Sequence, residues 1–326
     1  MSSFPTASSA AAPPSASRRS LAALAVIAAL LPLVLPNAYT YEVAILVGIN
    51  AITCIGLNIL IGYAGQISLG HAGFFGLGAY GTALLASRYG WPTFVSLPAA
   101  TVSVGALAWL VGRPILRLRG HYLAMGTLGL GVIVSIVLAT EDRITGGPDG
   151  MAVPPLSAFG FAIAGEKAWY WIIAAVLVTC VWLAQNLIES PRGRALRALH
   201  GSEIAAGAAG IDASRHKLHA FVLSAVFAAL AGGLAAHYAG FITPAKASFL
   251  HSIELVTMVV FGGMASTAGA VVGAAVLTTL PQLLTVLKEY ETVTLGAVMM
   301  LTMIAMPRGL IPTLEKALDA ARGKPV

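Results

Sequence analysis

Charged residues are missing from long windows of this chain, and short polar segments separate these windows. The windows without Asp, Glu, Lys or Arg are 20–41, 43–87, 89–112, 120–140, 168–188, 218–245, 255–287 and 292–307. A helix needs about 20 apolar residues to cross a hydrocarbon layer of about 30 Å, and most of the windows reach that length. The pattern therefore predicts an all-α, polytopic integral membrane protein.

We expect about ten transmembrane helices, since each crossing takes about 20 residues. The window 43–87 must hold two spans, with a turn near Gly62–Gly65. The stretch 247–287 is broken by Gly262, Gly263 and Gly269 and is expected to hold two shorter spans. The expected spans are 21–36, 43–61, 64–86, 93–111, 121–139, 168–188, 218–240, 250–264, 267–287 and 292–306.

Composition supports this prediction and excludes other classes of protein. Of the 326 residues, 58% are hydrophobic and 10% are charged, with a mean hydropathy of +0.85. Soluble domains carry about 25% charged residues, so a soluble enzyme, a DNA-binding protein and a disordered chain are excluded. Cys54 and Cys180 both lie in apolar windows on different spans, where they are interpreted as small buried hydrophobes.

The distribution of Lys and Arg predicts the orientation. With alternating spans and a cytoplasmic N-terminus, only Arg88, Arg143, Lys167, Lys246 and Lys288 lie outside, and the other basic residues lie inside. This agrees with the positive-inside rule and predicts both termini in the cytoplasm. The excess of basic residues therefore needs no nucleic-acid partner to explain it.

The chain is expected to divide into three parts. Residues 1–20 form a disordered Ser/Ala/Pro-rich cytoplasmic tail, 21–306 the transmembrane permease domain, and 307–326 a cytoplasmic C-terminal tail. The basic pair before the first apolar window also resembles a secretory signal, with a cleavage region near Asn37. A retained first span is favoured, because the later windows already define an integral membrane protein.

A glycine-rich segment, 62–81, carries polar residues at membrane depth. Small residues let helix backbones approach closely in lipid, so the glycines indicate tight helix packing. Gln66, Ser68 and His71 either bond to a neighbouring helix or line a wet pathway. Glu254 is a carboxylate within a proposed span; it is either a gating or pathway group, or a structural group at the outer interface.

The segment 189–217 is the longest cytoplasmic loop. Ser190 and Pro191 are typical of a helix start. A short Ala-rich helix is expected over Ser202–Gly210, and Asp212 can cap the helix that re-enters the membrane. From the residues alone, this loop is either a docking element for a cytoplasmic partner or a basic loop that only sets topology.

Motifs for catalysis are missing from the sequence. It contains no P-loop, no H-E-x-x-H and no G-x-S-x-G. We therefore predict no enzyme activity, no catalytic residues, no cofactor and no metal site.

Several segments, taken in order, resemble the LivM-type permease subunits of bacterial branched-chain amino acid ABC importers. They cover about four-fifths of the chain, and the ordered set is far more specific than any one segment. The matching stretches are Gly62–Ala72, Leu118–Tyr122, Thr145–Gly150, Ser190–Leu196, Ala209–Ile211, Lys217–Phe221, Ser252–Glu254 and Pro307–Leu310.

The resemblance implies a type II ABC importer-like permease in the bacterial inner membrane. It implies a second related permease subunit, two cytoplasmic P-loop ATPase subunits and a periplasmic solute-binding protein as partners. ATP would be hydrolysed on the ATPase chains, and the loop 189–217 would carry the coupling helix. The residues assigned to ATPase coupling are Arg194, Arg197, Ser202, Glu203, Ala206, Gly207 and Gly210. The substrate would be a branched-chain amino acid, or another amino acid, an amide or urea.

Two other classes of protein stay open on the residues alone. A secondary transporter would use Glu254 and His71 as proton carriers, and inverted repeats would favour it. A membrane-embedded enzyme would cluster catalytic residues at one membrane face, and the sequence shows no such cluster.

Overall fold

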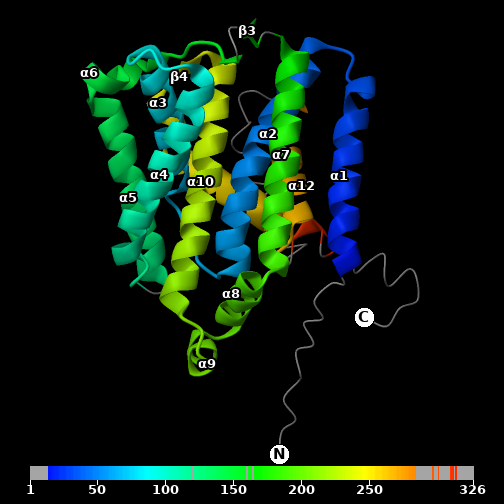
Figure 1. The fold of residues 1–326 in the computed structure, drawn as a ribbon, viewed down its shortest axis with the longest axis vertical. Helices are drawn as coiled ribbons and strands as arrows, with labels where there is room; N and C mark the ends of the chain where they lie inside the picture. The colour runs from blue at the N-terminus through cyan, green and yellow to red at the C-terminus, as the bar shows by residue number, and fades with distance from the viewer. Residues whose placement is uncertain are drawn as a thin grey trace, which may run out of the picture.

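The computed structural model describes residues 14–118, 120–158, 161–163 and 165–283, together with 296, 300, 309–311 and 313. The expected span 292–306 and the expected C-terminal tail therefore lie almost entirely outside the described residues. The described chain is mostly helical, in agreement with the predicted fold class (Figure 1). The longer helices are α1 (Pro14–Val34), α2 (Ala38–Asn58), α3 (His71–Ser87), α4 (Thr93–Ile115), α5 (His121–Thr140), α7 (Glu166–Glu189), α10 (Ala213–Ala239), α11 (Phe249–Gly262) and α12 (Thr267–Leu283).

Short elements connect these helices at the two ends of the bundle. The short helices are α6 (Asp142–Thr145), α8 (Pro191–Gly201) and α9 (Glu203–Ala208), with 3-10 turns η2 (Gly147–Asp149) and η3 (Pro244–Ala247). Two small antiparallel ribbons pair β1 (Met151–Ala152) with β4 (Phe241–Ile242) and β2 (Ser157–Ala158) with β3 (Phe161–Ala162). The β4 and α6 end lies opposite the α8–α9 end (Figure 1).

Several helices have the length and apolarity of membrane spans. In the described part of the chain, five qualify: Ala38–Tyr63, Thr93–Ile115, His121–Thr140, Glu166–Glu189 and Ala213–Ala239. Three shorter apolar helices cover Ser20–Leu33, Phe249–Gly262 and Thr267–Gln282. The prediction of a polytopic membrane protein is confirmed at this level. α1 begins at Pro14, within the segment expected to be a tail.

The prediction of a helix over 64–86 is wrong for its first third, residues 64–70. α2 continues into η1 (Ile59–Tyr63), a π-helical turn, and residues 64–70 are not helical before α3 begins at His71. Gly65 has φ +66°, a left-handed conformation that ends the helix. Irregular backbone at membrane depth must be buried in protein or line a cavity. Here the Leu69 amide donates to Thr127 Oγ1 of α5 at 3.1 Å.

Glycines of the glycine-rich segment 62–81 lie where backbones approach closely, as Gly78 does between α3 and α10. A methyl group added to Gly78 would overlap the backbone of Ala229, and one added to Gly232 would overlap the backbone of Phe75. α10 also contacts α4 and α2, so it stands at the centre of the bundle. The interpretation of these glycines as sites of close helix approach is confirmed.

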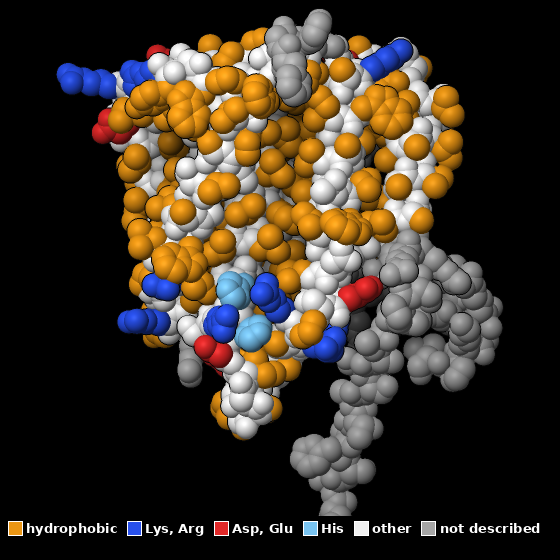
Figure 2. All heavy atoms as spheres, viewed as in Figure 1, with side chains coloured by type: hydrophobic (Ala, Val, Ile, Leu, Met, Phe, Trp, Pro, Cys, Tyr) orange, Lys and Arg blue, Asp and Glu red, His pale blue; other side chains and the backbone are white. Residues whose placement is uncertain are grey.

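Charge and apolar surface divide the molecule into bands. Hydrophobic side chains cover the middle of the bundle, and Lys, Arg and His side chains gather at the α8–α9 end (Figure 2). Large apolar side chains of α4, α5 and α7, including Trp109, Ile133 and Trp182, are exposed on this middle band. An exposed apolar band of this kind is the surface expected against lipid.

Candidate functional site

Three side-chain caps build the loop between α7 and α10. Ser190 Oγ accepts from the Gly193 amide at the start of α8, where Pro191 is the first residue. Ser202 Oγ accepts from the Ala205 amide at 3.2 Å at the start of α9. Asp212 Oδ1 accepts from the Arg215 amide at 3.1 Å at the start of α10. The predicted helix starts at Ser190 and Asp212 are confirmed, because a cap satisfies an otherwise unpaired amide.

α9 is joined to α10 by an ion pair. Lys217 Nζ of α10 lies 2.6 Å from Glu203 Oε2 of α9, and the Lys217 side chain is only 13% exposed. Ala206, on the inward face of α9, is buried, and Gly210 ends the segment with φ +81°. α9 is therefore fixed to the end of α10 as one unit.

The outer face of α9 is small and apolar, and one large side chain stands on it. Ile204 is 87% exposed. A methyl group added to Gly207 would meet nothing within 4 Å, so the face beside Ile204 is open. An isolated exposed isoleucine is unremarkable alone, but here it lies at the tip of the loop that projects from the bundle (Figure 1).

Arg194 and Arg197 lie on α8 and differ in their bonding. Arg194 Nη1 donates to the Glu189 backbone carbonyl at 3.2 Å, which ties α8 back to α7. Arg197 is exposed at the same end of the molecule. His200 of the same helix packs against Gly65, so α8 contacts the non-helical segment 64–70.

Sequence reasoning did not single out Ile204 or Lys217. Ile204 lies in an Ala-rich run, and its exposure depends on which face of α9 packs inward. Lys217 was counted among the cytoplasmic basic residues and began the matching stretch Lys217–Phe221, but no role was assigned to it. The spacing of Lys217 from Glu203 gives no signal, because a turn separates α9 from α10.

His71 forms a fully buried polar contact between segments far apart in the sequence. Its Nδ1 lies 2.9 Å from Ser68 Oγ, and its Nε2 bonds with Ser224 Oγ of α10. Phe74 and Phe221 pack edge-on against the imidazole ring. The geometry is that of interhelical bonding, one of the two alternatives for His71.

Gln66 is buried but unpaired. Its side chain is 3% exposed, and in the described part of the chain neither Oε1 nor Nε2 has a hydrogen-bond partner. Ser68, on the same non-helical segment, bonds with His71, whereas Gln66 bonds with no described residue.

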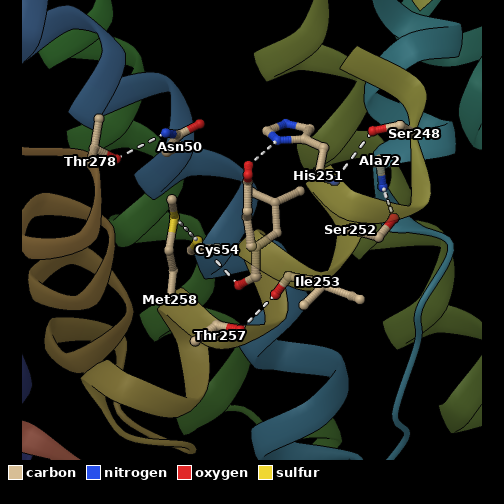
Figure 3. A network of polar contacts seen from close by, with 12 residues as sticks. Asn50, Cys54, Ala72, Ser248, His251, Ser252, Ile253, Thr257, Met258 and Thr278 are labelled. Atoms are coloured by element: carbon tan, nitrogen blue, oxygen red, sulfur yellow. Dashed lines mark hydrogen bonds and ion pairs between the residues drawn. The ribbon is translucent and has the colours of Figure 1, made fainter. Parts of the chain in front are cut away.

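Glu254 lies on α11 beside His251. Its Oε2 is 3.1 Å from His251 Nδ1, and the Glu254 side chain is 48% exposed. The first turn of α11 is fixed by two bonds: the His251 amide donates to Ser248 Oγ, and Ser252 Oγ accepts from the Ala72 amide (Figure 3). The structure does not bring Glu254 together with His71.

Glu254 lines a cavity of about 870 Å³ between α2, α7, α10, α11 and α12, at the β4 end of the bundle. Phe241 and Lys246 line it near the β4 end, and Asn50, midway along α2, lines it as well. Asn50 Nδ2 donates to Thr278 Oγ1 of α12 at 2.9 Å (Figure 3). The cavity volume is in the range of small-ligand pockets, about 300–1,000 Å³.

The turn between α11 and α12 is hydrogen-bonded to the C-terminal end of α2 and to η1. Asn58 of α2 accepts from the Ala265 amide and donates to the Ser266 carbonyl, both at 3.0 Å. Tyr63 Oη donates to the Ala265 carbonyl at 2.6 Å. Ala265 has φ +60°, an uncommon conformation for a residue with a side chain. These bonds hold the turn against the inner end of α2 and η1.

The described residues offer no group of side chains suited to bind a metal ion. They contain no group of three or more His, Cys, Asp or Glu side chains that could hold a metal ion. Cys54 and Cys180 are buried free thiols, as interpreted from the sequence.

A bundle of apolar helices of membrane-spanning length, with a cavity at one end and a projecting basic loop at the other, is the architecture of a multi-pass membrane protein. The chain belongs to the family described as branched-chain amino acid transport system / permease component, whose profile matches residues 39–306. The resemblance drawn from the sequence is thereby confirmed.

Three relatives illustrate the match. The chain is 36% identical to the high-affinity branched-chain amino acid transport system permease protein LivM of Escherichia coli strain K12, over 93% of this chain and 77% of that protein. It is 35% identical to LivM of Salmonella typhimurium over the same shares. Identity to LivH of Salmonella typhimurium is 27%, over 73% of this chain and 75% of that protein. No solved structure matches the chain significantly.

Proposed function

We propose that this chain is the transmembrane permease subunit of an ATP-binding-cassette importer for branched-chain or related amino acids. The observation that carries the proposal is the family match over residues 39–306, together with 36% identity to a LivM permease. The fold supports it, since apolar helices of membrane-spanning length surround a cavity at one end of the bundle.

The working importer has further subunits. A second, related permease completes the membrane part, and similarity to LivH relatives supports such a pairing. Two cytoplasmic P-loop ATPases supply the energy, because this chain has no P-loop of its own. A periplasmic solute-binding protein delivers the substrate to the outer end. The complex lies in the bacterial inner membrane.

Within this complex, the α8–α9 end faces the cytoplasm and contacts an ATPase. The cluster of basic residues at that end supports the orientation. α9 is short, projecting and apolar on its outer face, so that Ile204 can insert into a cleft on the partner. Ser202, Glu203, Ala206, Gly207 and Gly210 shape this helix, while Arg194 and Arg197 flank it on α8.

Coupling then works through rigid elements. Closure of the ATPase dimer moves α9, and the Glu203–Lys217 ion pair passes that displacement to α10. α10 contacts α2, α3 and α4, so its movement shifts the helices that surround the cavity. Access thereby alternates between the cavity at the β4 end and an opening at the α11–α12 turn. Gln66 and Ser68 lie in the non-helical segment 64–70, which contacts α8, and His71 at the start of α3 bonds with Ser224 of α10.

Affinity purification from the native membrane, followed by mass spectrometry, tests the assembly. We expect a second permease and P-loop ATPases to co-purify with the tagged chain. Reconstituted with the binding protein, the complex should import L-leucine only with ATP inside. A chain that purifies alone and transports alone, driven by a proton gradient, would contradict the proposal and indicate a secondary transporter.

A further inference from the structure

Basic side chains from two helices meet where α10 leaves the apolar band of the bundle. His219 of α10 lies within electrostatic reach of Arg192 of α8 and of Arg215 and His216 on α10. Arg192, Arg215 and His219 are exposed. Figure 2 shows Lys, Arg and His side chains gathered directly below the apolar band. The molecule therefore presents a group of cations at the edge of its apolar surface.

Carboxylates of the chain do not neutralise this group. Among the described residues, none forms an ion pair with Arg192 or Arg215. Asp212 accepts a hydrogen bond from the backbone amide of Arg215, as the cap of α10. Glu203 is paired with Lys217. Cations held close together repel one another, so an anion bound between them is stabilised.

The position of these cations on α10 is more specific than a topological signal requires. Arg215 stands just before the charge-free window 218–245, and His219 lies one helical turn further on the same face. The exposed or partly exposed apolar residues of this face continue at helical spacing along what we call the α10 stripe, made of Val222, Leu223, Val226 and Leu230. Val226 packs beside Gly105, so the stripe runs along α4.

A cationic group at the end of an apolar stripe matches the two parts of a phospholipid. The phosphate lies at the membrane interface, at the edge of the charge-free window, and the acyl chain lies in the hydrocarbon layer. Arginine donates two parallel hydrogen bonds to a phosphate group, and basic pockets between membrane helices bind anionic headgroups. A soluble anion would leave the α10 stripe without a partner.

We propose that Arg192, Arg215 and His219 bind the phosphate of an anionic phospholipid whose acyl chain lies along the α10 stripe. The lipid joins the start of α8 to the start of α10, which are the two ends of the loop that carries α9. This site is separate from the transport cavity and does not depend on which substrate is imported.

Native mass spectrometry of the purified, delipidated complex tests the site. The probes are phosphatidylglycerol, phosphatidylcholine with the same acyl chains, and glycerol 3-phosphate, which has no acyl chain. Phosphatidylglycerol should bind most tightly, and glycerol 3-phosphate should not bind at the same concentration. Arg192→Gln and Arg215→Gln should each weaken phosphatidylglycerol about fivefold, as expected for one basic residue at a membrane surface.

Two other arginines provide matched controls. Arg117→Gln removes an exposed cation at the same end of the bundle that is not among the charges acting on His219. Arg88→Gln removes an exposed cation after α3, at the opposite end. Both should bind phosphatidylglycerol as the unmodified complex does. Arg215→Lys keeps the charge and should retain most of the affinity, which a folding defect at this position would not allow.

Three results would overturn the proposal. Equal binding of phosphatidylglycerol and phosphatidylcholine, or an equal loss in Arg117→Gln, would show only general attraction of the basic end for membranes. Binding of glycerol 3-phosphate as tight as that of phosphatidylglycerol would show a site for soluble anions. Lower ATPase recovery in Arg192→Gln and Arg215→Gln, with unchanged lipid binding, would assign these arginines to the ATPase contact.

Discussion

Lys217 Nζ lies 2.6 Å from Glu203 Oε2, and this ion pair is the contact that fixes the tip of the α7–α10 loop to the end of α10. Both side chains are partly screened from water, so the pair is expected to contribute about 1 kcal/mol, near the upper limit for surface pairs. Lys217→Met should leave assembly intact but lower leucine uptake per ATP hydrolysed, because α9 can then move without α10. Parallel ATPase and uptake assays in proteoliposomes measure the ratio.

The charge-reversed double variant is the control for that prediction. Glu203→Lys with Lys217→Glu should recover more coupling than either reversal alone, since the pair is remade with opposite polarity. Replacement of Glu203 and Gly207 by bulky residues should uncouple hydrolysis from uptake more severely. Normal uptake in that bulky variant would contradict a role of α9 in coupling.

Ile204 is expected to be the main anchor of the ATPase contact. It is 87% exposed on the free chain, so Ile204→Asp should not affect folding of the subunit. At an interface, loss of an apolar anchor costs about 2 kcal/mol or more, which is roughly a thirtyfold loss of affinity. Co-purification of the ATPase should therefore fall sharply.

The same substitution at the opposite end provides the comparison for Ile204. Ile144 of α6 is 50% exposed near the ribbon end, away from α9. Ile144→Asp should leave ATPase recovery unchanged. Equal recovery in both variants would show that Ile204 does not contact the ATPase.

Gly78 tests whether α3 and α10 must touch at the backbone. A methyl group there overlaps Ala229, so Gly78→Ala must push the two helices apart. Overpacking of this kind costs about 1–3 kcal/mol. We therefore expect the detergent-purified complex to unfold at a lower midpoint temperature. Fluorescence-detected gel filtration after heating measures that temperature.

Gly129 of α5 is the matched control for Gly78. A methyl group at Gly129 meets nothing within 4 Å, so Gly129→Ala fits without displacement. Alanine is also preferred to glycine inside helices by about 0.5–1 kcal/mol. The Gly129→Ala complex should melt at the same temperature or higher. If Gly129→Ala lowered the melting temperature as much as Gly78→Ala does, close packing of α3 and α10 would not be the cause.

The sequence was sufficient for the features that depend on local chemistry. Charge-free windows gave the helices that cross the bundle, because a buried charge is costly wherever it occurs. Ser190 and Asp212 were recognisable as caps from residue type and position alone. A turn near Gly62–Gly65 was predicted, but the length of the non-helical segment 64–70 was not, because the window 43–87 has no charged residue and a charge count cannot separate helix from extended chain.

The polar contacts of the bundle depend on tertiary packing and left no local signal. Glu42, Glu166 and Lys246 line one cavity from three separate segments, so their spacing in sequence is uninformative. The same holds for Asn58 and Ala265, which bond across about two hundred positions. Glu254 was identified because a lone carboxylate in an apolar window is conspicuous, and His251 was noted as its neighbour; that the two side chains bond depends on the helical turn that joins them.

His71 is expected to stabilise the bundle and not to carry substrate. Its ring joins Ser68 and Ser224 in a site without solvent exposure. His71→Ala leaves both hydroxyl groups unpaired, and each buried unpaired group costs about 1–3 kcal/mol. The thermal midpoint should therefore fall strongly.

The triple variant His71→Leu, Ser68→Ala, Ser224→Ala should recover part of the loss, because it removes all the polar groups together. Below the midpoint of each variant, leucine uptake per assembled complex should match the unmodified importer. A His71→Ala complex that melts normally but transports poorly would instead place His71 on the pathway.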